Sequence, residues 1–135
     1  MEVHIPATPH KLLNPNKTVS QKDRQQLDWP LPTKSASVIK FALRRQLQET
    51  TILSAINGRP KAPLRGPVIL RFTVAYEKGR QIPDWDNCCA TLKGVIDGLV
   101  QAGYMADDDQ VRGIFIDRIM DPAKQGYIEV RLEAA

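Results

Sequence analysis

One stretch of this chain, Pro83–Val111, constrains its fold more than any other. It begins with two aspartates one residue apart, Asp84 and Asp86, and ends with three in succession, Asp107–Asp109. Between the two acidic groups, apolar residues recur at the spacing of one face of an α-helix, and Gly103 supplies a stop signal. The stretch therefore predicts one amphipathic helix with carboxylates at both ends.

A charged stripe runs beside the apolar face of this predicted helix. At about 100° per residue, Lys93 and Asp97 fall within roughly 20° of Asp86. Lys93 and Asp97 are also four residues apart, which is the spacing of a helical ion pair. The adjoining apolar face consists of Cys89, Leu92, Ile96, Leu99 and Val100. We therefore expect a single helix that presents its charged stripe to one side and buries the neighbouring face.

Carboxylates at both ends of one helix need a compensating charge, because like charges held close together repel. Hard oxygen ligands suit Mg²⁺ or Mn²⁺, and such an ion can activate water and stabilise a leaving phosphate oxygen. The alternative is that Asp84 and Asp86 cap the helix and favour its dipole. A lone Asp-x-Asp favours capping, whereas the lysine on the same face and the second acidic cluster favour a metal site.

The charge of the chain is divided unevenly between its two halves. Residues 1–82 hold 14 Lys and Arg against 5 Asp and Glu, and residues 83–135 hold 5 against 10. A basic N-terminal part followed by an acidic cluster is typical of a protein that binds nucleic acid, although basic side chains are also common on solvated surfaces. No apolar run reaches membrane-spanning length and no N-terminal signal segment is visible, so we expect no membrane contact and a cytoplasmic location.

The other elements predict an α+β fold in a single domain of 135 residues. Residues 1–34 form a basic, proline-rich arm with a short strand at Val3–Ile5, and residues 35–135 form the core. We expect a helix over 35–56 and, from the alternation of apolar residues, a strand over Val68–Tyr76. Strands over Val111–Ile119 and Tyr127–Glu133 are expected to pair as an antiparallel hairpin with a turn over 121–126. The architecture is thus a small mixed, mostly antiparallel sheet of three to four strands with two long helices packed on it.

Basic side chains in the arm, the first long helix and the loops are candidate contacts to a DNA backbone. The candidates are Lys34, Arg44, Arg65, Lys78 and Arg80. For the arm as a whole, exchange with a partner chain and a mobile terminus are the alternatives to DNA contact. Trp29 within the arm is either a stacking platform for a base or an anchor for the arm, and the anchor is the favoured interpretation.

Several features of the acidic stretch follow one another in a fixed order at near-fixed spacing. They are Pro83-Asp84-x-Asp86-Asn87, then Lys93, Asp97-Gly98-Leu99, Ala102-Gly103 and Asp107-Asp108. This set resembles the RusA family of Holliday junction resolvases, strongly over about residues 68–132 and faintly in the arm. Members of that family are small, homodimeric, Mg²⁺-dependent endodeoxyribonucleases, often encoded by phages and prophages.

The resemblance implies roles for the matching residues. Asp84, Asp86 and Asp108 match the catalytic acids that hold the metal, and Asp107 is the alternative third acid. Lys93 matches a lysine that stabilises the transition state or orients the nucleophile. Some members carry this lysine three residues sooner, where the present chain has Ala90.

The activity implied is hydrolysis of four-way DNA by paired symmetric nicks in recombination and repair, with Mg²⁺ or Mn²⁺ as the metal. A homodimer is expected, because a two-fold axis matches the two symmetric strands of a junction. One rival interpretation is a non-catalytic protein of the same fold that binds branched DNA. Another is a structure-specific nuclease that cuts flaps or forks. Phosphatases and transferases with Asp-x-Asp need larger domains and are disfavoured.

Overall fold

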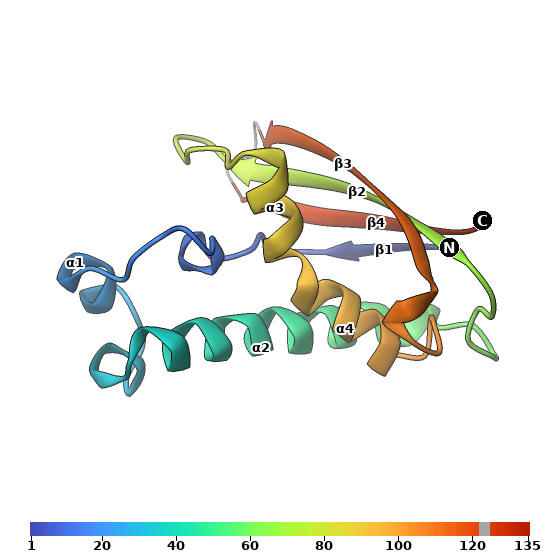
Figure 1. Cartoon of the computed structure of the whole chain (residues 1–135), viewed down its shortest axis with the longest axis horizontal. Coiled ribbons are helices and arrows are strands. Elements are labelled where there is room, and N and C mark those ends of the chain that lie inside the picture. The colour runs from blue at the N-terminus through green and yellow to red at the C-terminus, as the bar shows by residue number, and fades with distance from the viewer. Residues whose placement is uncertain (122–124) are drawn as a thin grey trace.

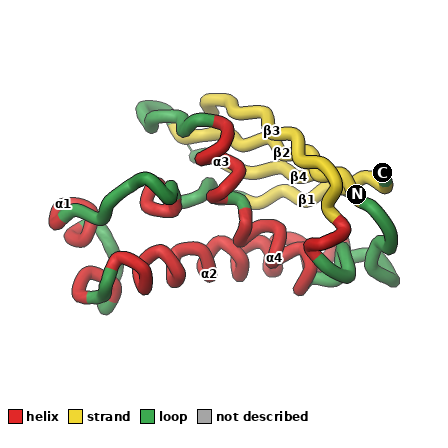
Figure 2. Tube along the Cα trace, viewed as in Figure 1, coloured by secondary structure: helices red, strands yellow, loops and turns green. Residues whose placement is uncertain are grey.

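The structure, a computed structural model, describes residues 1–121 and 125–135 (Figure 1; Figure 2). Its strands are β1 (Glu2–Ile5), β2 (Val68–Glu77), β3 (Val111–Asp121) and β4 (Tyr127–Ala134). Its helices are α1 (Gln21–Gln25), α2 (Ala36–Ala55), α3 (Trp85–Thr91) and α4 (Lys93–Gln101). The predicted strands and the helix over 35–56 are confirmed. The predicted turn over 121–126 falls partly outside the described residues.

All four strands form one sheet in the order β1-β4-β2-β3. β4 is antiparallel to both of its neighbours, whereas β2 and β3 are parallel, so the predicted mixed, mostly antiparallel sheet is confirmed. The predicted hairpin between 111–119 and 127–133 is wrong, because β2 lies between β3 and β4. The cause is the crossover through α3 and α4, which returns the chain to the start of β2, so that β3 runs in the same direction as β2.

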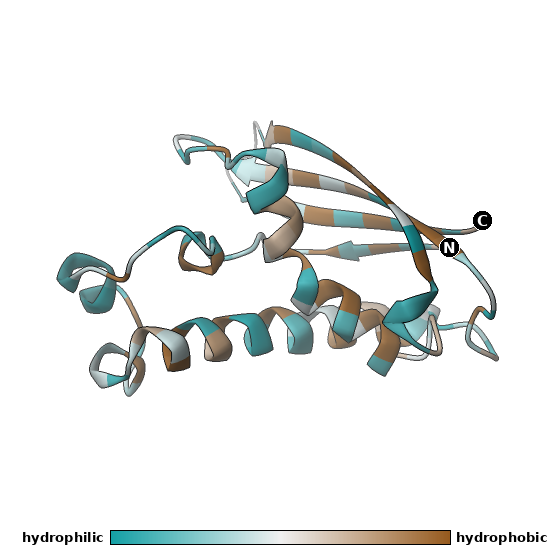
Figure 3. Ribbon diagram, in the orientation of Figure 1, coloured by the Kyte–Doolittle hydropathy of each residue, from teal (hydrophilic) through white to brown (hydrophobic). Residues whose placement is uncertain are grey.

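The two faces of the sheet differ in polarity, as the alternating colours along the strands show (Figure 3). Leu70, Phe72 and Val74 of β2 belong to the buried core beneath the helices, whereas the intervening Arg71 is exposed on the opposite face. This alternation follows from the two-residue repeat of a strand. Within the described residues, no helix combines the length and apolarity needed to cross a membrane.

The predicted single helix of the acidic stretch is two helices, α3 and α4, which meet at Leu92. Leu92 has φ −88° and ψ 0°, and its N–H donates to Cys89 O, three residues earlier, which tightens the end of α3. From this break α3 rises towards the sheet while α4 lies beside α2 (Figure 1). The prediction of one continuous helix is therefore wrong, and Asp86 does not share a helix with Lys93 and Asp97.

Two glycines of α4 allow this helix to approach the backbone of α2. A Cβ atom at Gly98 would lie 2.7 Å from Thr51 Cβ and 2.9 Å from Gln48 O. A Cβ atom at Gly94 would lie 2.8 Å from Arg44 O. Close-packed interiors do not accommodate such short contacts, so a larger residue at either position would force the helices apart. The contact fixes where α4 begins and therefore where Lys93 lies.

Gly98→Ala is expected to destabilise the protein by about 1–3 kcal/mol, because the added methyl group overpacks the contact between α2 and α4. Gly113→Ala in β3 is the matched control, since a Cβ atom there has its nearest neighbours at ordinary distances of 3.7 and 3.8 Å. Unfolding in urea measures both free energies. A Gly98→Ala protein as stable as the wild type would show that the helices tolerate separation.

Candidate functional site

Lys93, the first residue of α4, connects two acidic segments. Its Nζ atom lies 3.0 Å from Asp97 Oδ1, one turn further along the helix, and forms a close ion pair with Asp108 Oδ2. The pair with Asp97 is the one that the four-residue spacing predicts, and it is confirmed. The pair with Asp108 holds the short turn Asp108–Gln110 against the start of α4.

The acidic triplet is arranged by its own hydrogen bonds and by Gln110. The Asp107 carboxylate accepts a hydrogen bond from the Asp109 N–H at 3.0 Å, and Gln110 Oε1 accepts one from the Asp107 N–H at 2.9 Å. Gln110 Nε2 also donates to the carbonyls of Leu64 and Gly66 at 2.8 and 2.9 Å. Carboxylate oxygens of all three aspartates lie within 4.8 Å of one another. The turn therefore presents clustered acceptors on a braced backbone.

The charges around Lys93 stabilise one another. The Lys93 ammonium lowers the pKa of the Asp108 carboxyl below its ordinary value, and a hydrogen bond with Asp107 lowers it further. Hydrogen bonds to Asp108 first and Asp97 second raise the pKa of Lys93. An opposite charge favours the ionised form of each group, so both partners stay charged across the neutral pH range.

Asp84 and Asp86 lie at the start of α3 and are exposed. The backbone carbonyl of Asp84 accepts the Cys88 N–H at 2.8 Å, but the Asp84 side chain makes no capping hydrogen bond. Asp84 is thus the N-cap residue of α3 by position but lacks the side-chain hydrogen bond of a cap, whereas Asp86 lies in the first turn, where its charge favours the helix dipole. Among the described residues, no hydrogen bond or ion pair engages the Asp84 carboxylate, so it is available to an external ligand.

The structure brings together only part of the predicted site. Within the described ranges, the triplet is the one group of three or more acidic, His or Cys side chains with ligand atoms inside 4.8 Å. Asp84 and Asp86 are not part of that group. Asp86 lies in α3, on the other side of the break at Leu92 from Lys93. The candidate site thus has two carboxylate groups. One lies at the start of α3, and the other lies in the turn Asp108–Gln110, which Lys93 holds against the start of α4.

Two residues near these groups were not predicted from the sequence. Gln110 braces the triplet, and Arg118 of β3 donates from Nη1 to the Pro83 carbonyl at 2.6 Å, directly before Asp84. The Arg118 contact depends on the position of β3 at the sheet edge, and no local sequence pattern signals it. The Gln110 contacts do have a sequence signal, because a side chain three residues after Asp107 completes a capping box.

The predicted DNA contacts fall into two groups. Four of them are exposed, namely Lys34, Arg44, Arg65 and Lys78. In the sequence, Arg65 stands between Leu64 and Gly66, whose backbone carbonyls accept the hydrogen bonds of Gln110. Arg80 is half-buried, because its guanidinium donates to Thr8 Oγ1 at 3.0 Å and Pro9 O at 2.6 Å and lies 5.0 Å from the Tyr76 ring centre. Arg80 therefore holds the arm to the core, and two of its donors are already used.

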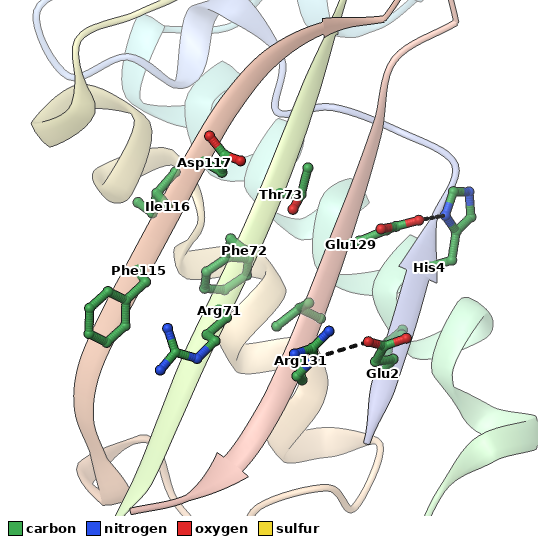
Figure 4. Close-up of a pocket in the computed structure, with 12 residues that line it drawn as sticks. Glu2, His4, Arg71, Phe72, Thr73, Phe115, Ile116, Asp117, Glu129 and Arg131 are labelled. Atoms are coloured by element: carbon green, nitrogen blue, oxygen red, sulfur yellow. Dashed lines mark hydrogen bonds and ion pairs between the residues drawn. The ribbon is translucent and has the colours of Figure 1, made fainter.

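The open face of the sheet carries a hollow of about 690 Å³ that contains none of the predicted site residues (Figure 4). Two pairs of its polar side chains bridge neighbouring strands. Arg131 contacts Glu2 at 3.0 Å and His4 contacts Glu129 at 3.3 Å. Three acidic residues line this hollow against two arginines and His4, so the hollow carries no excess of positive charge and does not have the character of a phosphate-binding surface.

Asp108→Asn is expected to lower the pKa of Lys93, because Asp108 raises this pKa more than Asp97 does and the substitution removes its charge. Asp109→Asn is the control, since Asp109 makes no contact with Lys93 among the described interactions. Titration of the Lys93 side chain by NMR measures the effect. An unchanged Lys93 pKa in Asp108→Asn would contradict the ion pair.

No protein-family model matches this chain, and a search of curated proteins finds no relative. The resemblance to the RusA family therefore stays a prediction that rests on the acidic motif.

Proposed function

We propose that this chain is a Mg²⁺-dependent endodeoxyribonuclease that resolves four-way DNA junctions by paired symmetric nicks. The observation that carries the proposal is the exposed Asp84 carboxylate at the start of α3, which makes no capping hydrogen bond, together with the clustered triplet beside Lys93. The RusA resemblance assigns catalytic roles to these same positions. Phosphodiester hydrolysis requires activated water and charge stabilisation, which cations held by carboxylates provide.

The side chains at both groups fit a hard divalent cation. All the candidate ligands are carboxylate oxygens, which Mg²⁺ and Mn²⁺ prefer, and the Asp108 side chain is 41% exposed, so an ion can reach it. Asp84, Asp86 and Asp108 would hold the ion, with Asp107 as a further candidate. When bound, the ion supplies an activated water and neutralises charge on the phosphate.

Lys93 supplies a permanent positive charge beside these acids. Its pKa is raised by Asp108 and Asp97, so it stays protonated at neutral pH. A protonated lysine can donate hydrogen bonds to phosphate oxygens and stabilise the negative charge that develops during attack on phosphorus. We assign Lys93 this role, and we assign Asp97 the orientation of its side chain.

The distribution of basic residues supports a polyanionic substrate. Residues 11–45, which span most of the arm and the first half of α2, contain eight Lys and Arg against two Asp. Phosphate contacts of this kind position DNA without selecting its sequence. A homodimer would place one such site at each of the two strands to be cut. A cytoplasmic role in recombination and repair, with a phage or prophage origin, completes the proposal.

One observation favours a second candidate, a non-catalytic protein that binds branched DNA. Lys93 already neutralises Asp108, and the carboxylates at the start of α3 lie apart from the triplet. A nuclease must bring a metal to these acids, whereas a binding protein needs only the basic surface. Cleavage of DNA therefore separates the two candidates.

The proposal is tested with a synthetic four-way junction, a linear duplex and a flap, each incubated with Mg²⁺ or with a chelator. We expect paired nicks in the junction that require Mg²⁺. Asp84→Asn and Asp108→Asn should each reduce the rate by about 100-fold or more, the scale of losing one charge-stabilising group. Asp117→Asn on the open face of the sheet is the control and should cut normally.

Two outcomes would contradict the resolvase proposal, and a third would contradict the assignment of its site. Junction binding without cleavage in Mg²⁺ or Mn²⁺ would favour the binding protein. Preferred cleavage of the flap would support a nuclease but would contradict the assignment as a junction resolvase. Full activity in Asp84→Asn would show that the carboxylate at the start of α3 is not part of the catalytic site.

A further inference from the structure

We propose that a groove between the arm and helices α2 and α3 binds an unpaired DNA strand, with a base stacked on Phe41 and the backbone held by Arg44. The groove has a volume of about 450 Å³. Leu13 and Pro15 form its wall on the arm, Phe41 and Arg44 its wall on α2, and Ala90 and Thr91 its end at α3. Because the ligand is DNA, the inference rests on the proposed function and adds a strand-binding site to it.

Hydrogen bonds hold both walls of the groove in place. Lys40 of α2 donates from Nζ to the backbone carbonyls of Asn14 and Lys17 at 3.0 and 2.7 Å, which docks the arm on the helix. Asn16 Nδ2 donates to Asn87 Oδ1 at 3.2 Å, which ties the arm to α3 one residue after Asp86. Ligand sites are usually preformed in this way. A preformed groove lowers the entropic cost of ordering protein side chains and loops when a ligand binds.

Phe41 is the aromatic side chain that this groove exposes. It is 55% exposed, and the Arg44 guanidinium carbon lies 5.8 Å from its ring centre. A single exposed phenylalanine is common on protein surfaces. Here, however, it stands beside an arginine inside a basic groove, and an aromatic ring next to a cation is the combination that proteins use to bind single-stranded nucleic acid.

Charge and geometry select an unpaired strand as the occupant. Lys40 and Arg44 are the charged residues that line the groove, and the stretch 11–45, which supplies most of its walls, holds eight basic against two acidic residues, which attracts a polyanion. Stacking on Phe41 needs the free face of a base, which a paired base in a duplex does not offer. A second hollow shares Phe41 and Arg44 and continues between α2 and α4 as far as Asp97, the partner of Lys93. A strand bound in the groove would therefore lead towards the candidate acids.

The test is the binding of a fluorescent oligodeoxythymidylate of about 12 nucleotides, measured by anisotropy in the presence of a chelator. Phe41→Ala should weaken binding by about tenfold, the effect of losing one base–aromatic stack. Phe41→Trp should retain the affinity of the wild type. Leu53→Ala is the matched control, because Leu53 is a 73% exposed apolar residue of α2 that lines neither hollow.

The salt dependence tests the role of Arg44. Removing one phosphate contact should reduce the slope of log affinity against log salt by about 0.7 in Arg44→Gln. An affinity that is equal in wild type and Phe41→Ala, or duplex bound as tightly as the single strand, would overturn the inference.

The strand-binding site and the proposed nuclease can fail separately. If the protein cleaves junctions but Phe41→Ala does not weaken its binding of single-stranded DNA, the proposed function stands and the strand-binding groove is wrong. If Phe41→Ala weakens strand binding but the protein cleaves no DNA, the strand-binding groove stands and the nuclease proposal is wrong.

Discussion

The close approach of α4 to α2 is the constraint on which the arrangement of the acidic residues depends. With Gly94 and Gly98 against the backbone of α2, α4 lies closely beside the longer helix. The segment before it has to reach the sheet, so the chain breaks at Leu92 and α3 points elsewhere. The break separates Asp84 and Asp86 from the helix that carries Lys93. A packing contact between two backbones thus determines how the carboxylates are divided.

The division gives the two carboxylate groups different electrostatic states. The triplet contains its own counter-charge, because Lys93 pairs with Asp108 and raises the proportion of ionised carboxylate. Asp84 lacks a capping hydrogen bond and faces solvent. Under the proposed function, a cation would gain most at the uncompensated group and would compete with Lys93 at the other. Lys93 released from Asp108 would then be free to contact a phosphate.

The sequence predicts those parts of the fold and site that depend on local spacing. Alternating apolar residues locate β2 and β4, and the four-residue spacing identifies the pair of Lys93 with Asp97. Alternation says which face is buried but not which strand is adjacent, so the parallel pairing of β2 with β3 was missed. The break at Leu92 was missed as well. Its only sequence signal is the glycine pair four residues apart, which makes a close helix contact possible without specifying it.

The central claim is that Asp84 and Asp108, although divided by the break, serve one metal site. Direct titration with Mn²⁺, counting free ion by electron paramagnetic resonance, tests this claim without depending on activity. We expect one class of site, with an affinity that falls at least about tenfold in both Asp84→Asn and Asp108→Asn. Asp84→Asn that binds Mn²⁺ as the wild type does would show that the acidic triplet acts alone and would contradict the claim.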